Sequence, residues 1–326
     1  MALRLSVTVG ILSYLFRRVP ISDVMAAMAT AHARSLLLAF VLCVLTHFIA
    51  GYRLMLLTDR QGISVSTAQA VEINLAAIFY GLSLPGGNLT GGVIRFYRLA
   101  GQERKMAKAF AALACDRVVA TVTLCLLGIV FWMVNRPPES GYIGLSMVAV
   151  LGGLIISALL LAQGGVADWF DDYLERGRGV FFFSKVMRLS STLARYRDLS
   201  LKSVALILVL SMASHLLGIL AWYLLGISVK VDLSLATMGW VRSAVLLITL
   251  VPISISGLGV REGAVVFLLE PYGVSRAKRM AFSFLVFGVT VLTMGALGGL
   301  LEGRRTLSRM VSKLAARREK RANGRR

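Results

Sequence analysis

Apolar residues occur along this chain in runs long enough to cross a bilayer. A helix needs about 20 mainly apolar residues to span the hydrocarbon core. Five runs meet that need or come close: Leu36–Tyr52, Ala109–Met133, Tyr142–Gln163, Val204–Ser228 and Met280–Leu301. A sixth run, Ala68–Leu84, qualifies if the polar side chains of Glu72 and Asn74 face protein rather than lipid. The pattern predicts an all-α, polytopic integral membrane protein.

Two further stretches are apolar but irregular. Leu5–Phe16 is short and flanked by arginines, and no small-residue cleavage site follows it, so we expect an uncleaved anchor. Leu233–Leu269 is long enough for two passes but is interrupted by Pro252 and by Gly257 and Gly259. We therefore expect about seven or eight transmembrane helices in a single domain over residues 1–302, followed by a basic tail over 303–326.

Composition and charge agree with this picture. The chain is 57% hydrophobic and 16% charged, whereas a soluble domain carries roughly a quarter charged residues. The net charge is +20, but the sequence contains no nucleic-acid-binding motif, so we expect no nucleic acid partner. Lys and Arg are enriched in cytoplasmic loops, which predicts that the stretch 94–108, the amphipathic connection 164–202 and the C-terminal tail are cytoplasmic.

Two segments share one pattern, a proline and a glycine-containing stretch that ends in a Gly-apolar-Arg step. The first covers residues 84–95 and contains Pro85, and the second covers 251–261 and contains Pro252. Proline removes a helical donor and glycine is costly in a helix, so the backbone should break at both places. The alternative is that these residues only kink two continuous helices.

The position of the two segments predicts a repeat. They lie about half the chain length apart, and corresponding interrupted segments in two halves indicate a transporter's binding site. We expect two re-entrant segments on opposite faces, a possible inverted repeat. The basic residues Arg276, Lys278 and Arg279 would then lie outside, against the charge rule.

The arginines that end the two segments are the main candidates for substrate binding. Irregular backbone at membrane depth survives where protein buries it or where it lines a wet cavity. The planar fork of arginine can bond two phosphate oxygens at once, which suits a lipid head group. The substrate-binding candidates in the two segments are Arg95, Arg261, Asn88, Gly91, Gly92, Gly257 and Gly259.

Polar residues inside or beside the apolar runs form a second group of candidates. A charge at the bilayer centre costs at least about 2.5–3.5 kcal/mol, so these side chains should find partners. We expect an interior polar network made of Glu72, Asn74, Asp116, Arg117 and Glu262. A network that only fixes helix packing explains these residues as well as a substrate pathway does.

Motifs for catalysis and metal binding do not occur in the chain. There is no GxSxG, HExxH or P-loop sequence, and the three histidines are scattered. We expect no enzymatic activity, no cofactor and no metal.

The two segments, taken with Asp116-Arg117 between them, resemble the lysylphosphatidylglycerol synthase transmembrane-region family over about residues 35–302. The resemblance also assigns Arg53 to a family arginine position and implies a bacterial inner-membrane protein. In bifunctional family members this region translocates aminoacylated phosphatidylglycerol, and a separate soluble domain, which we do not find in this sequence, makes that lipid.

The resemblance implies a flippase-like lipid translocase that moves a phosphate-bearing or isoprenoid lipid across the inner membrane. Its partners would be membrane lipids. The alternative is a non-transporting scaffold that presents lipid to a partner glycosyltransferase or lipid-modifying enzyme. Relatives accompany hopanoid, glycolipid and glycosyltransferase pathways, so the lipid itself stays open.

Overall fold

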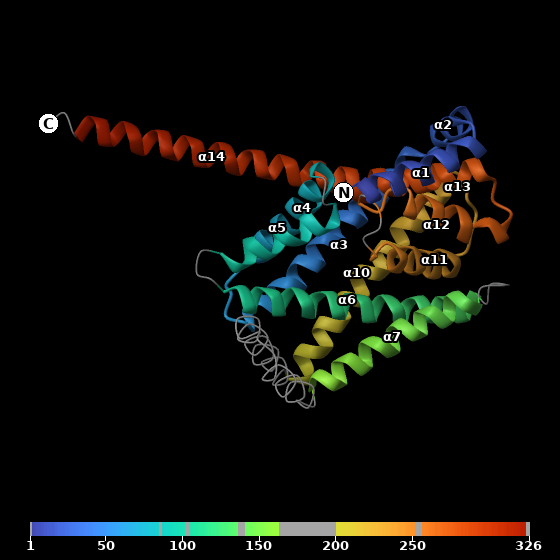
Figure 1. Cartoon of the computed structure of the whole chain (residues 1–326), viewed down its shortest axis with the longest axis horizontal. Coiled ribbons are helices and arrows are strands. Elements are labelled where there is room, and N and C mark those ends of the chain that lie inside the picture. Colours follow the sequence, from blue (N-terminus) through green and yellow to red (C-terminus); the bar gives the residue numbers. More distant parts are fainter. Residues whose placement is uncertain are drawn as a thin grey trace.

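The computed structural model describes residues 2–84, 87–101, 105–135, 141–162, 200–251, 254 and 256–323, which are helical apart from short connections (Figure 1). The α-helices are α1 Ala2–Arg18, α2 Ile21–Ala29, α3 Ala33–Asp59, α4 Thr67–Ser83, α5 Asn88–Ala100, α6 Met106–Asn135, α7 Gly141–Ala162, α10 Leu201–Ser228, α11 Leu235–Ile248, α12 Val260–Leu268, α13 Arg276–Phe287 and α14 Thr293–Asn323. A 3-10 turn, η1, covers Glu270–Tyr272, and a π-helical stretch, η2, covers Gly288–Leu292. The predicted all-α class is confirmed. Pro85, Pro252 and most of the 164–202 connection lie outside the described residues.

Within the described residues, four helical stretches are long and apolar enough to cross a membrane. They are Ala33–Asp59, Met106–Asn135, Leu201–Ser228 and the continuous helix Arg276–Ser308, which joins α13, η2 and the start of α14. Each contains one of the predicted apolar runs. Shorter apolar helices cover Gly141–Gly153 and Leu235–Ile248. The chain is therefore a multi-pass membrane protein.

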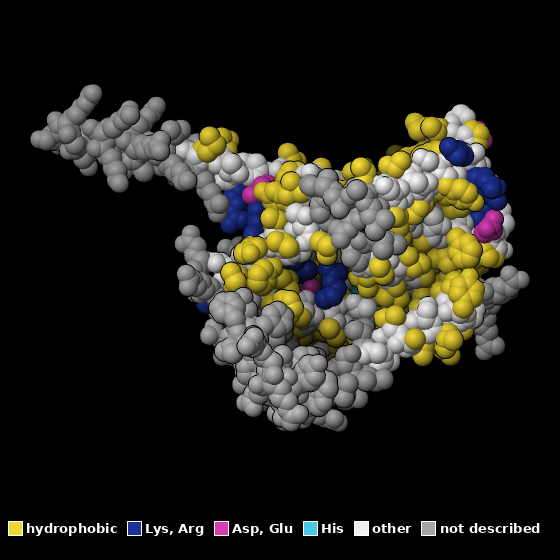
Figure 2. All heavy atoms as spheres, viewed as in Figure 1, with side chains coloured by type: hydrophobic (Ala, Val, Ile, Leu, Met, Phe, Trp, Pro, Cys, Tyr) yellow, Lys and Arg dark blue, Asp and Glu magenta, His cyan; other side chains and the backbone are white. Residues whose placement is uncertain are grey.

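The helix α3 shows how such a helix divides its surface. Large apolar side chains at spacings of three or four residues are exposed along one face, at Leu37, Val41, Leu45 and Phe48. Because an α-helix has about 3.6 residues per turn, this spacing keeps them on one side. A contiguous exposed apolar face of this kind is suited to lipid. Hydrophobic side chains are also spread over much of the surface in Figure 2.

The first Gly/Pro segment connects two helices that fold back on each other. Gly81 of α4 lies beside Gly87, and Gly91 of α5 lies against the backbone of Ala77, so α4 and α5 run antiparallel as a hairpin. The charge pattern predicts a loop over 94–108, and this is wrong for residues 94–100 and 106–108, which belong to α5 and α6. The helix α5 continues to Ala100 and ends at Gly101, whose φ of +58° stops the helix.

The second segment also breaks the chain, between α11 and α12. Three residues just before α12 have positive φ: Ser256 at 53°, Gly257 at 77° and Gly259 at 81°. Glycine adopts this region readily, whereas serine does so at a cost, so the connection is a defined turn. The two helices contact each other, as α4 and α5 do. The predicted interruption of Leu233–Leu269 is confirmed.

Helices α3 and α10, each of which comes one helix before an interrupted hairpin, pair along their lengths. Contacts between α3 and α10 join Arg60 to Ser203, Arg53 to Ser211 and the His32 amide to the Ser228 carbonyl. Residue numbers rise on one helix as they fall on the other, so α3 and α10 are antiparallel.

The helices that follow α3 and α10, namely α4 and α11, also pack in matching ways. Helix α4 of the first half packs against α14 of the second half. Its counterpart α11 of the second half packs against α6 of the first half. Gly128 of α6 faces Ser243 of α11, and Gly298 of α14 faces the backbone of Leu75 of α4. Small residues let the helices approach closely in both cases.

The N-terminal helices cover the second half of the molecule. Helix α1 matches the predicted short run Leu5–Phe16 and contacts α12, whereas α2, which the sequence pattern does not predict, packs on α13. Leu15 and Val24 share a buried cluster with Met280. At the other end, α14 continues through the predicted boundary at residue 302 and projects away from the body (Figure 1).

Candidate functional site

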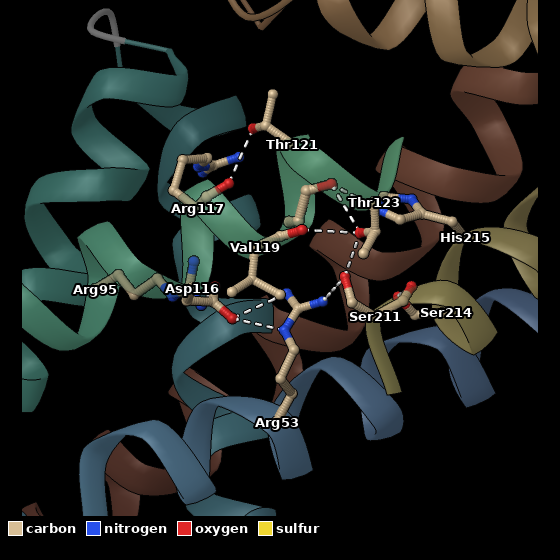
Figure 3. A network of polar contacts seen from close by, with 11 residues as sticks. Arg53, Arg95, Asp116, Arg117, Val119, Thr121, Thr123, Ser211, Ser214 and His215 are labelled. Atoms are coloured by element: carbon tan, nitrogen blue, oxygen red, sulfur yellow. Dashed lines mark hydrogen bonds and ion pairs between the residues drawn. The ribbon is translucent and has the colours of Figure 1, made fainter. Parts of the chain in front are cut away.

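A buried group of charges lies where α3, α5 and α6 meet (Figure 3). The carboxylate of Asp116 on α6 accepts hydrogen bonds from Arg53 on α3, with Nε and Nη2 both 2.9 Å from Oδ1. Its other oxygen, Oδ2, accepts from Nη2 of Arg95 on α5 at 2.8 Å. Asp116 is only 4% exposed. One carboxylate therefore holds together two candidate spans and one arm of the first hairpin.

The arginine from α3 is fully engaged. Nη1 of Arg53 donates to Oγ of Ser211 on α10 at 2.9 Å, and that hydroxyl lies 2.6 Å from Oγ1 of Thr123. Thr123 donates in turn to the carbonyl of Val119 at 2.8 Å. Arg53 and Asp116 thus form a fixed support that adds a third span to the group.

The other arginines keep unused donors. Arg95 places one terminal nitrogen on Asp116, and its buried Nε has no hydrogen-bond partner in the described part of the chain. Arg117, next to Asp116 on α6, is exposed. Arg53 and Arg95 bind Asp116 and Arg117 is its neighbour in the chain, so these four described residues together carry an excess of two positive charges. Such a group can accept an anion.

Charged side chains show in a hollow of the surface in Figure 2. In Figure 2, Lys or Arg and Asp or Glu side chains show at the floor of a hollow where α3 passes α6 in Figure 1. Charged side chains that can be reached from outside can bind a ligand of opposite charge.

Polar residues predicted to join one network are divided among separate places. Glu72, in the N-terminal half of α4, pairs with Arg305 at 3.1 Å, and both side chains are partly exposed. Asn74 is on the same helix, and its buried Oδ1 has no partner among the described residues. Of the predicted network only Asp116 and Arg117 lie in the charged group.

Glu262 acts locally at the start of α12. Its Oε2 accepts from the backbone amide of Gly259 at 2.6 Å, which satisfies one of the free amides of the helix N-terminus. Its Oε1 accepts from Nε and Nη2 of Arg261, both at 3.1 Å, and the Arg261 guanidinium lies 4.6 Å from the centre of the Phe287 ring. The charge of Arg261 is therefore compensated within its own helix.

The two interrupted segments meet near a cavity. Oγ of Ser256 in the second segment donates to the carbonyl of Gly81, just before the first, at 2.8 Å. A cavity of about 290 Å³ lies beside this contact and is lined by Asn88 from the first hairpin, Arg261 from the second and residues of α3, α10 and η2.

Arg242 also lines this cavity, and it is absent from the candidates that the sequence pattern predicts. It lies on α11 and is only 8% exposed. Its Nε and Nη1 have no hydrogen-bond partner among the described residues. The guanidinium lies against Gly218 of α10, where a methyl group would stand 2.7 Å from its Cζ. The signal that could have found it is a single charge within the apolar 235–248 helix.

The predicted glycines serve different purposes. Gly91 allows α5 to touch the backbone of α4, and Gly257 and Gly259 adopt positive φ. Gly92 is exposed, and a methyl group added to it would meet no atom within 4 Å. The geometry explains Gly91, Gly257 and Gly259 by the backbone alone.

Paired antiparallel spans and broken-helix hairpins define a polytopic membrane protein with arginines buried in its interior. The chain belongs to the lysylphosphatidylglycerol synthase TM region family, whose model matches residues 1–298. The match begins at the N-terminus rather than near residue 35, so α1 and α2 are part of the family region. No curated protein matches the chain.

Proposed function

We propose that this protein is a lipid translocase that moves a phosphate-bearing or isoprenoid lipid across the bacterial inner membrane. Membership of a family associated with the lysylphosphatidylglycerol synthase TM region supports a role in lipid handling. The observation that carries the proposal is the buried Arg53–Asp116–Arg95 group, because its excess positive charge suits the phosphate of a head group.

In this proposal Asp116 and Arg53 stay in place while Arg95 changes partner. Arg53 has three bonds to fixed groups, but Arg95 has one bond to Asp116 and an unused Nε. A phosphate near Arg95 and Arg117 could accept from both guanidinium groups without breaking the Arg53–Asp116 pair. The first hairpin, which carries Arg95, would then bind the head group while the lipid tails stay in the bilayer.

The arrangement of the two halves gives a route between leaflets. The antiparallel pairing of α3 with α10 and the matched packing of α4 and α11 support an inverted repeat with two re-entrant hairpins. Alternating exposure of the central sites would follow from movement of one half against the other. We infer that the C-terminal tail is cytoplasmic and that the protein acts without enzymatic chemistry.

A dithionite-bleaching assay in proteoliposomes tests this function. Fluorescent phosphatidylglycerol in the outer leaflet is bleached by dithionite, and translocation extends bleaching to the inner-leaflet pool. The inner-leaflet pool should be bleached faster in liposomes with wild-type protein than in empty liposomes. In liposomes with Arg95→Gln, this increase in rate should be smaller by about tenfold or more. The matched control is Arg98→Gln, because Arg98 lies one turn further along α5 and pairs with Glu302 instead. Equal rates for wild type and Arg95→Gln would refute the role given to this group.

A second candidate function is that of a lipid-presenting scaffold. The observation that favours it is the projection of α14 away from the helical body, which offers a basic helix to a partner glycosyltransferase or lipid-modifying enzyme (Figure 1). Full translocation activity after removal of residues 309–326 would favour the translocase over this alternative.

A further inference from the structure

Arg242 is a buried cation that forms no ion pair with an acid in the described part of the chain. No aspartate or glutamate belongs to the cavity lining, which comes entirely from described residues. The other arginine there, Arg261, is already paired with Glu262. An uncompensated buried charge is strongly unfavourable unless a counter-charge and hydrogen-bond partners are supplied. The free Nε and Nη1 of Arg242 therefore point to an anion as the missing partner.

The rest of the lining includes hydroxyl groups that can act as acceptors. Three threonine hydroxyls in the cavity wall already donate to carbonyls of their own helices, Thr46 to Leu42 at 2.9 Å, Thr249 to Leu246 at 2.9 Å and Thr290 to Val286 at 2.7 Å. A hydroxyl that has used its proton can still accept a hydrogen bond. The cavity thus combines a planar cationic donor with acceptors that suit the polar remainder of a ligand.

The size and position of the cavity limit what it can hold. A volume of about 290 Å³ is at the lower end of ligand pockets, which suits a head group without acyl chains. The walls include apolar side chains such as Ile78, Leu82 and Leu246. Both interrupted segments contribute, through Asn88 and Ser256, so occupancy would bridge the two halves.

We propose that this cavity is a second phosphate-binding site, with Arg242 as the residue that holds a phosphate ester. The proposal rests on the proposed function and deepens it, because it gives the head group a second binding site that is separate from the Asp116 group. The fork of Arg242 binds two phosphate oxygens, and the threonine hydroxyls accept hydrogen bonds from hydroxyl or amino groups attached to the phosphate.

Arg242→Met separates this role from a structural one. Methionine keeps much of the length of the side chain and removes a charge that has no internal partner, so the ligand-free melting temperature in maltoside micelles should stay equal or rise. Binding of dihexanoylphosphatidylglycerol, followed by the ligand-induced rise in melting temperature, should weaken by about tenfold or more. The charge-matched control is Arg34→Met, on the exposed N-terminal turn of α3, which should bind as wild type does.

Gly218→Ala provides a second variant that keeps the arginine. The added methyl group would displace the flexible guanidinium of Arg242 and should weaken binding of the same probe. Gly152→Ala on α7 is the matched control, since its added methyl group would meet no atom within 4 Å.

The probes also distinguish the source of the phosphate. Binding of dihexanoylphosphatidylglycerol that inorganic phosphate does not displace assigns a lipid head group, and binding of inorganic phosphate alone assigns a free anion. Unchanged lipid binding by Arg242→Met, or a fall of its ligand-free melting temperature, would overturn the proposal. Arg242-dependent binding in a protein that fails to translocate lipid would keep this site and reject only the proposed function.

Discussion

Replacing Asp116 by asparagine should destabilise the protein strongly. The substitution keeps the shape of the side chain but removes the negative charge that Arg53, which is buried, and Arg95, which is partly buried, share. Asp116 accepts hydrogen bonds from Arg53 at 2.9 Å and from Arg95 at 2.8 Å. Asparagine offers one carbonyl oxygen and an amide that would point its hydrogens at a guanidinium.

The magnitude follows from burial. The side chains of Asp116 and Arg53 are 5% and 6% exposed, so neither charge left behind can be hydrated without rearrangement. Removing one partner of a buried ion pair costs about 3–5 kcal/mol, which lowers the folding equilibrium constant by roughly two to four orders of magnitude. Glu72→Gln is the control, because its side chain and that of Arg305 are 29% and 41% exposed. An exposed pair contributes about 0–1 kcal/mol.

Equilibrium unfolding in mixed micelles measures the loss of stability in Asp116→Asn and in Glu72→Gln. The mole fraction of dodecyl sulfate is increased, and tryptophan fluorescence is the signal. A double variant, Asp116→Asn with Arg53→Met, should recover part of the stability, because it removes the stranded charge of Arg53. A loss below about 1 kcal/mol for Asp116→Asn, comparable with Glu72→Gln, would show that this ion group does not support the fold.

Two further substitutions test how the halves fit together. Ser256→Ala removes the hydroxyl that donates to the Gly81 carbonyl, and it should cost about 1 kcal/mol in the same unfolding assay. Lipid translocation should also become slower. An unchanged translocation rate would mean that translocation does not need the contact between the segments. Gly298→Ala would drive a methyl group into the backbone of Leu75 and should lower the melting temperature by several degrees, while Gly303→Ala on the same helix, with open space around it, should leave it unchanged. Equal melting temperatures for these two variants would contradict the close approach of α14 to α4.

The spans and their interruptions could be predicted because each depends on local sequence. Four of the predicted apolar runs lie within helices that are long and apolar enough to cross a membrane, and the proline and glycine patterns mark both places where the chain turns back. The residues of α5 resemble a loop in sequence because their arginines and glycines are typical of a connection. The pairing of α5 with α4, through Gly91, is a tertiary effect that no local pattern states.

The candidate sites could be predicted only in part, because charge partners are far apart in the sequence. Arg53, Arg95 and Asp116 each stand out as candidates, but nothing local shows that one carboxylate binds both arginines. Glu262 is expected in the same network and instead caps its own helix. Arg242 carries no motif, and its importance depends on a cavity formed by elements from both halves.

The central claim is that buried arginines of this protein hold a phosphate-bearing lipid. Native mass spectrometry of the protein released together with its surrounding membrane tests this claim most directly. Wild type should retain one phosphate-bearing lipid class, and a folded Arg95→Gln/Arg242→Met variant should lose it. Retention of the same unselective lipid mixture by both proteins would contradict the account.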